Sequence, residues 1–184
     1  VLIDTQNLYH TAKHVYKNSR VNFGNVVKDA VAGRSLVRAL AYVITTESGD
    51  EKNFFQALEK MGIEIKTKEL QTFVDGSKKA DWDVAIAVDA IRIANRVDAV
   101  VIVSGDGDFY SLIEYLSDRQ KLLCIMTPNW RYSTLLKPFE RYIVRLDTLK
   151  YELSYRAFRS SHKKRDKAHI DSGTKPAHNR PQQK

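Results

Sequence analysis

The apolar run VVIV at residues 100–103 constrains the fold more than any other feature of this 184-residue chain. All four residues are β-branched, and the run lacks the polar alternation of a strand with one wet face, so it predicts a strand buried on both faces. Buried strands of this kind are typical of parallel sheets. The run is followed at once by SGDGDF (104–109), which places two aspartates at the end of a buried strand.

Short β-like runs alternate with helical patterns over roughly the first 155 residues, which is typical of an α/β fold with a parallel sheet. We expect a central, mainly parallel sheet of about five to six strands flanked by helices. The predicted strands lie at 1–4, within 35–44, and at 63–70, 99–103, 122–126 and 142–146. The predicted helices lie at 7–16, 22–32, 51–62, 81–96, 109–120, 132–140 (interrupted by Pro138) and 147–158, and a polar loop is predicted at 73–80.

The pattern stops near residue 160, and large apolar side chains are almost absent after it. We therefore expect one domain over residues 1–158 and a basic, disordered tail over residues 159–184. Residues 156–184 carry nine Lys and Arg against two Asp, which accounts for +7 of the net charge of +8. The remainder is nearly neutral, so the basic balance alone does not indicate a nucleic-acid-binding domain. The tail either adds salt-sensitive affinity for nucleic acid or serves as a solubilising linker.

The cysteine content and the hydropathy of the chain indicate in which cellular compartment the protein is expected. Cys124 is the one cysteine of the chain, which excludes an internal disulfide and predicts a buried thiol in a reducing compartment, so we expect a cytoplasmic protein. No apolar run approaches the ~20 residues that a membrane helix needs, so no membrane partner is expected. The chain opens at Val1 already inside a strand-like run, and we expect the natural start to lie upstream.

Acidic side chains follow two of the predicted strands. Asp4 ends VLID (1–4), and Asp106 and Asp108 follow the strand at 99–103. In open parallel sheets, functional groups gather beyond the carboxyl ends of strands where the strand order reverses, and right-handed crossovers readily place these two strands side by side. Asp83 lies near the start of the helix predicted at 81–96, after the polar loop, and can face the same rim. We therefore expect the four carboxylates to converge.

Converging carboxylates repel one another, at a cost of roughly 4 kcal/mol for a pair about 4 Å apart at an effective dielectric constant near 20. Either some are protonated or a cation lies among them, and oxygen ligands suit Mg²⁺ or Mn²⁺ rather than zinc. Such clusters commonly serve phosphoryl chemistry. Taken alone, SGDGD is equally compatible with a turn into a helix whose N-cap is an aspartate, but the second acidic strand end favours a site.

Three blocks of the sequence resemble a known family. VLIDTQNLY (1–9), KADWDVAIAVDA (79–90) and VIVSGDGDF (101–109) are similar to the NYN domains, the LabA-like branch of the PIN-like nuclease superfamily. The blocks occur in the family's order, and the likeness covers roughly residues 1–147. The resemblance implies a Rossmann-like (PIN-like) three-layer fold with one acidic metal site, and ribonuclease activity that depends on Mg²⁺ or Mn²⁺.

The resemblance also implies roles for individual residues. Its metal-binding and catalytic acids correspond to Asp4, Asp83, Asp106 and Asp108. Asn7 is implied to support the metal shell or the substrate, and Ser104 to bind a phosphate oxygen or a ligand carboxylate.

The chain departs from the family pattern at two places. Many relatives have Gly directly after the first Asp, where this chain has Thr5 and Gln6, and many have a Lys-Gly pair before the central helix, where it has KKAD (78–81). Asp81 is then either a fifth acid of the site or the helix N-cap, and we favour the cap. Asp89, inside the same predicted helix, either pairs with Arg92 or orients the site from behind.

Basic and aromatic residues near the predicted strand ends are candidates for RNA contacts. Lys78 and Lys79 are expected to contact phosphates, with a solvated loop as the alternative. Trp130, Arg131 and Tyr132 suit a stacking platform for single-stranded bases, with a partly buried aromatic cluster as the alternative.

Together these observations predict a metal-dependent endoribonuclease that hydrolyses phosphodiester bonds of RNA, expected to be single-stranded. The alternative is a catalytically inactive PIN-like module that binds RNA or acts as a scaffold. We expect no small-molecule organic cofactor, and an oligomer is compatible with the sequence. Other metal-dependent phosphotransfer folds are disfavoured, because a Toprim-like domain requires Glu where this chain has Asp4 and a D-x-D-x-T phosphatase requires a second Asp that DTQN lacks.

Overall fold

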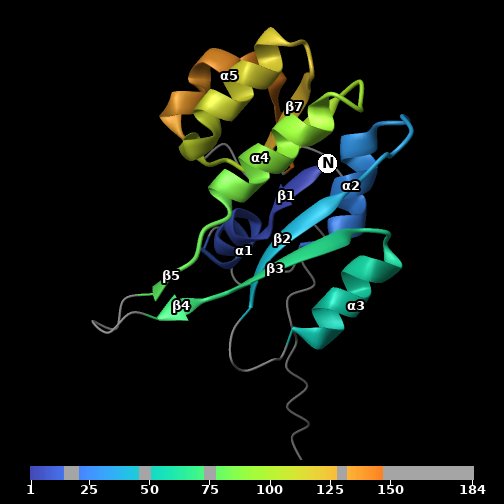
Figure 1. Ribbon diagram of the computed structural model, residues 1–184, viewed down its shortest axis with the longest axis vertical. Helices are drawn as coiled ribbons and strands as arrows, with labels where there is room; N and C mark the ends of the chain where they lie inside the picture. The colour runs from blue at the N-terminus through green and yellow to red at the C-terminus, as the bar shows by residue number, and fades with distance from the viewer. Residues whose placement is uncertain (15–20, 46–50, 73–77, 128–131, 147–184) are drawn as a thin grey trace, which may run out of the picture.

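The computed structural model describes residues 1–14, 21–45, 51–72, 78–127 and 132–146, and its centre is a sheet of six parallel strands (Figure 1). Their order across the sheet is β3-β2-β1-β6-β7-β8. The strands are β1 (Leu2–Asp4), β2 (Leu40–Thr45), β3 (Glu64–Glu69), β6 (Val100–Val103), β7 (Leu122–Thr127) and β8 (Ile143–Arg145). The expected α/β class with a parallel sheet is confirmed.

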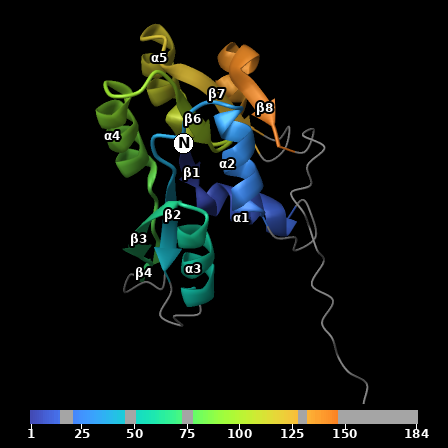
Figure 2. The same ribbon diagram turned by 90° about the vertical axis from the view of Figure 1, so that its right-hand side faces the viewer.

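Helices cover both faces of the sheet, which gives three layers (Figure 2). One core cluster holds the inner sides of α1 (Thr5–His14), α2 (Phe23–Val31) and α3 (Lys52–Lys60). The other holds α4 (Asp83–Ala94), α5 (Tyr110–Asp118) and the 3₁₀ segments η1 (Gly107–Phe109) and η2 (Thr134–Tyr142). The described helices include none long and apolar enough to cross a bilayer.

Successive residues of the central strands serve opposite cores. Val101 and Val103 join the α1–α3 cluster, whereas Val100 and Ile102 join the α4–α5 cluster. All four are buried, and each such side chain contributes about 1.5–3 kcal/mol of transfer free energy. The unbroken apolar run therefore has a direct cause, because both faces of β6 lie against helices.

The strand order reverses between β1 and β6. The chain adds β2 and then β3 on one side of β1, and it returns to place β6 on the other side. Leu2 is paired with Ile102 and Ile3 with Val103, so the next positions, Asp4 and Ser104, lie at neighbouring carboxyl ends. The predicted adjacency of the two acidic strand ends is confirmed.

The helix predicted over 81–96 begins later than expected. α4 starts at Asp83, its N-cap position is Trp82, and no side chain caps it by a hydrogen bond. The expectation that Asp81 is the N-cap is therefore wrong. Lys68 Nζ donates a hydrogen bond to the Asp81 carbonyl oxygen at 2.9 Å, which ties this residue to β3 ahead of the helix.

The helix predicted over 7–16 begins earlier than expected, at Thr5 directly after β1. Asp4 Oδ1 accepts a hydrogen bond from the Asn7 backbone N–H at 3.0 Å, as an N-cap does. The polar first turn TQN carries no apolar periodicity, so the pattern did not reveal it.

The loop predicted over 73–80 is partly wrong. Lys78–Lys79 form β5, which pairs antiparallel with β4 (Gln71–Thr72). A two-residue strand is too short to show alternation in the sequence. Near the end of the chain, Phe139 has non-helical angles (φ −104°, ψ 17°) after Pro138, so the predicted interruption is confirmed. The helix predicted at 147–158, the domain boundary and the tail lie outside the described residues.

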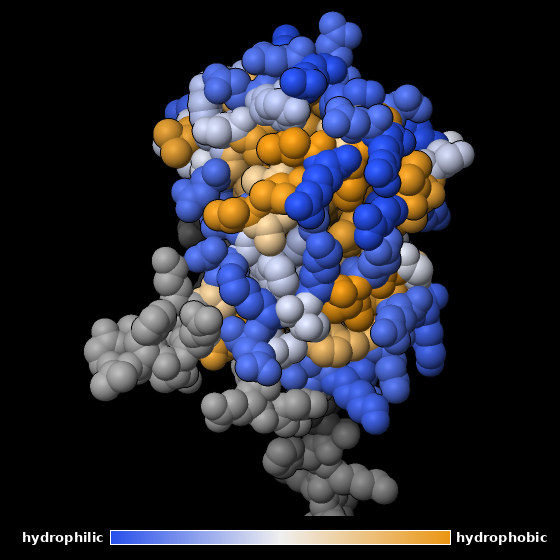
Figure 3. All heavy atoms as spheres, in the orientation of Figure 1, coloured by the Kyte–Doolittle hydropathy of each residue, from blue (hydrophilic) through white to orange (hydrophobic). Residues whose placement is uncertain are grey.

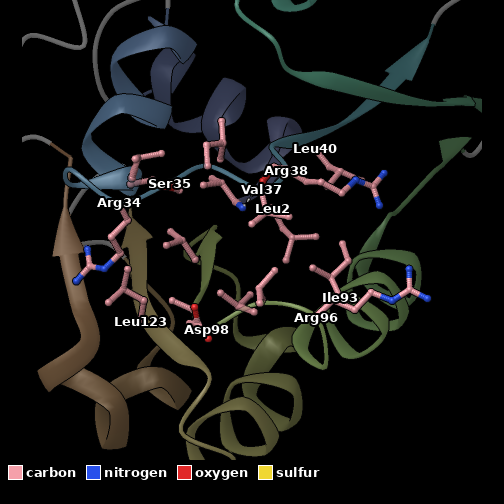
Figure 4. A pocket seen from close by; sticks show the side chains of 18 of the residues that line it. Leu2, Arg34, Ser35, Val37, Arg38, Leu40, Ile93, Arg96, Asp98 and Leu123 are labelled. Carbon is pink, nitrogen blue, oxygen red and sulfur yellow. Dashed lines mark hydrogen bonds between the residues drawn. The ribbon is translucent and has the colours of Figure 1, made fainter.

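A cavity of about 630 Å³ opens at the amino-terminal edge of the sheet, at the opposite end of the strands from Asp4 (Figure 4). Arg34, Arg38 and Arg96 line it together with apolar side chains of the strand starts. Arg38 donates hydrogen bonds from Nε and Nη2 to the two carboxylate oxygens of Glu64 of β3.

Candidate metal-binding active site

Asp4 is the structural hub of the candidate site. It is only 9% exposed at the end of β1, and its two carboxylate oxygens have different partners. Oδ1 accepts from the Asn7 backbone N–H, and Oδ2 accepts from Ser104 Oγ at 3.0 Å. The carboxylate is thereby fixed by the start of α1 on one side and by the end of β6 on the other.

Asn7 and Ser104 connect the first strand end to the loop that follows β6. Asn7 Oδ1 accepts a hydrogen bond from the Gly105 backbone N–H at 3.1 Å. Ser104 Oγ, besides donating to Asp4, accepts from the Asp106 backbone N–H at 3.2 Å. The contacts of both residues hold the loop against β1, and the role toward a metal or substrate that the resemblance implied for them stays a prediction.

Asp106 and Asp108 differ in their surroundings. Asp106 is half-buried and caps η1, because its Oδ1 accepts from the Asp108 backbone N–H at 3.1 Å. Asp108 is exposed. The turn with an aspartate N-cap, which the sequence left as an alternative, is thus present at the same place as the acidic strand end. The cap uses one of the two carboxylate oxygens of Asp106, and the carboxylate stays at the carboxyl edge of the sheet.

Gly107 is required by a close approach of the chain rather than by a special backbone angle. A Cβ at this position would lie 2.3 Å from Ser133 Oγ and 2.9 Å from Ser133 Cβ. Ser133 also donates its backbone N–H to the Gly105 carbonyl oxygen at 3.0 Å and caps η2. The segment that leads into η2 is therefore seated directly on the acidic loop.

Asp83 provides the electrostatic evidence that the acids converge. Partial burial, followed by the negative charges of Asp4, Asp106, Asp81 and Asp108, raises the pKa of Asp83 to about 6. Burial is also the main cause that raises the pKa of Asp4, with the charge of Asp106 adding to it while hydrogen bonds from Asn7 and Ser104 oppose it. Residues from three segments of the chain thus share one negative field at the reversal of strand order.

Asp89 makes its hydrogen bonds to Tyr42 and Lys66, and the charge of Arg92 has a smaller effect on it. It is 9% exposed, and its Oδ2 accepts from Tyr42 Oη at 2.7 Å and from Lys66 Nζ at 2.5 Å. Burial works to raise the pKa of Asp89, but the hydrogen bonds from Lys66 and Tyr42 outweigh it and hold the pKa low. Tyr42 is the neighbour of Asp4 across the sheet, so this network adjoins the site.

Several residues at the site escaped the sequence analysis. Tyr42 and Thr127 lie in the same row across the sheet as Asp4 and Ser104, and Thr127 is fully buried with no hydrogen-bond partner for its hydroxyl among the described residues. Strand register places them there, and register is invisible in one sequence. Ser133 was missed because its partner Gly107 is distant along the chain.

The candidate RNA-binding residues are only partly described. Lys78 and Lys79 lie on β5, in the hairpin that precedes α4 (Figure 1). Tyr132 is half-buried against the α4–α5 core, and its hydroxyl donates to Glu140 Oε1 at 3.4 Å. Trp130 and Arg131 lie outside the described residues. A stacking role for this aromatic group stays a prediction.

The donor set suits a hard divalent cation, because every candidate ligand is a carboxylate, amide or hydroxyl oxygen. Among the described residues, no three His, Cys, Asp or Glu side chains are close enough to hold an ion by themselves. Mg²⁺ does not require three, since it keeps several waters and is usually held by one or two carboxylates together with substrate phosphates. The residues therefore fit a site at which water and substrate complete the coordination.

Acidic side chains at the reversal of strand order in a three-layer, all-parallel α/β sheet are arranged as in Rossmann-like proteins that bind ligands at strand ends. The family model of the NYN domain matches residues 1–137. The chain belongs to the NYN-domain family, as the three sequence blocks indicated.

Two similar proteins support this assignment. The Low amplitude and bright protein LabA of Synechococcus elongatus is 28% identical over 153 residues, which span 78% of this chain and 81% of LabA. The crystal structure of a protein of unknown function, VPA0982 from Vibrio parahaemolyticus, has a TM-score of 0.70 and 34% identity, covering 80% of this chain and 91% of that protein.

Replacing Gly107 by Ala is expected to destabilise the protein by about 1–3 kcal/mol, because the added methyl group cannot fit beside Ser133. Chemical denaturation measures the effect. Gly24→Ala is the matched control, since its Cβ would meet the flexible side chain of Met61 at 3.3 Å and Asn22 Oδ1 at 3.4 Å, and its stability should change little. Equal stability of the two variants would contradict the close approach.

Replacing Asp83 by Asn is expected to stabilise the metal-free protein above pH 6. The folded-state pKa of about 6 exceeds the ordinary value of 3.8, so ionisation of Asp83 opposes folding, and wild-type stability falls as pH rises from about 4 through 6. The free energy of unfolding, measured from pH 3.5 to 8 in EDTA, should show the gain above pH 6 and none below pH 4. Asp98→Asn, at the other edge of the sheet, should follow the wild type. A gain that does not depend on pH would show that the charge of Asp83 is not the cause.

Proposed function

We propose that this chain is a metal-dependent endoribonuclease that hydrolyses RNA phosphodiester bonds at Asp4, Asp83, Asp106 and Asp108, with Mg²⁺ or Mn²⁺ as the cofactor. The observation that carries the proposal is the position of these acids at the carboxyl edge of the sheet, where burial and then the charges of the neighbouring acids raise the pKa of Asp83 to about 6. Membership of the NYN-domain family supports the nuclease class.

The chain's own residues supply position and charge. Asp4, held by Ser104 and by the first turn of α1, and Asp106, held by its cap of η1, present fixed carboxylate oxygens to a cation. Asp83 and the exposed Asp108 complete the acidic rim, and Asp81 is a fifth acid that adds to its charge. A bound divalent cation would lower the pKa of the attacking water and would stabilise the negative charge on the leaving oxygen.

No side chain acts as the nucleophile, because water attacks the phosphodiester directly. Asn7 fixes the Gly105 backbone and so sets the distance between the two acidic strand ends. Lys78 and Lys79, on the hairpin before α4, are proposed to contact RNA phosphates, and the group at Trp130, Arg131 and Tyr132 to contact unpaired bases. We place this activity in the cytoplasm, with no organic cofactor.

The second candidate function is a PIN-like module that binds RNA or acts as a scaffold without turnover. The observation that favours it is the absence, among the described residues, of three acidic or imidazole side chains already grouped around one point. The acids would then serve as a structural cap and loop anchor, which Asp4 and Asp106 already do. Cleavage separates the two candidates.

Asp106→Asn is expected to lower the cleavage rate of a labelled single-stranded RNA by 100-fold or more while keeping the fold. Asn preserves the cap of η1 through its side-chain oxygen, but it removes a negative charge that the cation requires. A time course in Mg²⁺ or Mn²⁺ measures the rate, and thermal unfolding verifies the fold. Asp98→Asn, prepared identically, should cleave like the wild type. Wild-type turnover by Asp106→Asn would rule out the assigned site.

Mn²⁺ is expected to raise the unfolding temperature of the wild type and not that of Asp4→Asn. A ligand that binds only the folded state stabilises it by about 2.7 kcal/mol at 100 times its dissociation constant. Asn at position 4 retains the hydrogen-bond acceptor for Asn7 but lacks the carboxylate charge. Thermal scans at increasing Mn²⁺ concentration, with Asp98→Asn as the control, measure the effect. A shift of equal size in Asp4→Asn would place the ion elsewhere.

A further inference from the structure

A groove with two chemically different walls lies between β3 and α4, beside the acidic rim. Its volume is about 390 Å³. Lys66 and Lys68 of β3 form one wall, and Val84, Val88 and Arg92 of α4 form the other. Figure 3 shows hydrophobic and hydrophilic side chains side by side on the face that these two elements present.

The groove lining holds three basic and two acidic side chains, a formal net charge of +1. Lys68 Nζ is bonded to a backbone carbonyl oxygen of Asp81, which carries no formal charge, and Arg92 is exposed. Lys66 Nζ is paired with Asp89, whose side chain is 13% exposed whereas that of Lys66 is 40% exposed. The groove therefore presents ammonium and guanidinium groups to solvent, while the carboxylate of Asp89 lies beneath them. Asp81 lies at the end that meets the acidic rim.

Both lysines are held in place before any ligand arrives. Lys66 Nζ lies 5.9 Å from the centre of the Tyr42 ring, and Lys68 Nζ lies 5.7 Å from the centre of the Trp82 ring. The two rings pack edge to face, with centroids 5.4 Å apart. Such cation–π contacts reduce the side-chain freedom that binding would otherwise remove. The ammonium groups are thus positioned as fixed anion contacts.

The groove is aligned with the candidate site. Lys66 is paired with Tyr42, and Tyr42 with Asp4, so these three residues lie in one row across the sheet. Neighbouring strands are about 4.8 Å apart, which puts the Lys66 backbone about 10 Å from that of Asp4. Lys68 lies two residues further towards the carboxyl edge on the same face. A chain of phosphates that passes the acidic rim can therefore continue along β3.

The α4 wall favours an unpaired strand over a duplex. Val84 is 74% exposed and Val88 39%, one helical turn apart and directed to solvent. Bases in a duplex are stacked and paired, so a duplex would offer the groove only sugars and phosphates. Unpaired bases have apolar faces that can cover these valines while the phosphates contact the lysines.

We propose that the groove between β3 and α4 binds single-stranded RNA next to the cleavage site, with phosphates on Lys66 and Lys68 and bases over Val84 and Val88. The inference rests on the proposed function, because it assigns the groove to the substrate of that site. It commits to RNA because the exposed cations complement a polyanion. It also defines the substrate as an unpaired segment that extends beyond the cleaved bond.

Binding of a fluorescein-labelled, unstructured U-rich 10-mer to the full chain carrying Asp106→Asn, measured by anisotropy in EDTA, tests the groove without turnover. One lost phosphate contact should lower the slope of log K against log salt by about 0.7 and weaken binding about fivefold at 0.1 M salt. We expect this result for Lys68→Gln. Lys28→Gln on α2, an exposed lysine on the other face, is the control and should change neither. Lys68→Gln behaving like Lys28→Gln would overturn the proposal.

Val84→Ser tests the apolar wall. It should weaken binding of the single strand severalfold with an unchanged salt slope, and Val37→Ser, 63% exposed at the opposite edge of the sheet, should have no effect. A duplex of the same sequence that binds as tightly, and loses as much affinity in Val84→Ser, would overturn the single-strand assignment. Self-association that Val84→Ser abolishes, with RNA binding unchanged, would overturn it in favour of a protein contact.

The outcomes for the groove and for the nuclease are separate. If the protein cleaves RNA normally but Lys68→Gln and Val84→Ser leave its RNA affinity unchanged, the groove assignment is wrong and the nuclease proposal stands. If Lys68→Gln lowers the salt dependence of RNA binding but the protein never cleaves RNA, the groove assignment stands and the nuclease proposal is wrong.

Discussion

The hydrogen bond from Ser104 to Asp4 joins the two strand ends on which the rest of the site depends. It forms because β1 and β6 are neighbours at the point where the strand order reverses. The same carboxylate caps α1 through Asn7, and Asn7 in turn holds Gly105. One buried aspartate thus determines where α1 begins and where the acidic loop lies. A carboxylate is tolerated there because hydrogen bonds satisfy both of its oxygens.

Near the carboxyl edge of the sheet, the acidic cluster and the basic side chains of the groove occupy neighbouring areas. The acids of β1, the loop after β6 and the start of α4 lie close enough that their charges add to the effect of burial in raising the pKa of Asp83. The adjoining groove presents Lys66, Lys68 and Arg92. A cation bound by the acids would neutralise their negative charge, and a polyanion bound by the basic wall would neutralise the adjacent positive charge. This pairing unites the proposed metal site with the proposed RNA groove.

Much of the architecture was predictable from local pattern. The unbroken run at 100–103 indicated a strand buried on both faces, and the acids that follow two strands indicated the crevice, because parallel strands bring their carboxyl ends to one edge. The start of α4 was misplaced, since Lys68 ties Asp81 to β3 and leaves the helix without a side-chain cap. Contacts between segments far apart in the sequence override local capping preferences in this way.

The sequence by itself determined the α/β class and the candidate acids, because these follow from residue type and from position relative to a strand end or a helix start. The positions Asn7 and Ser104 came from the resemblance to the NYN domains. Only the tertiary structure decided which residues stand beside them. Tyr42 adjoins Asp4 through strand register, Lys66 reaches Asp89 across two elements, and Gly107 is required by the approach of Ser133. Register and close approach are properties of chain segments brought together by folding, and no local pattern encodes them.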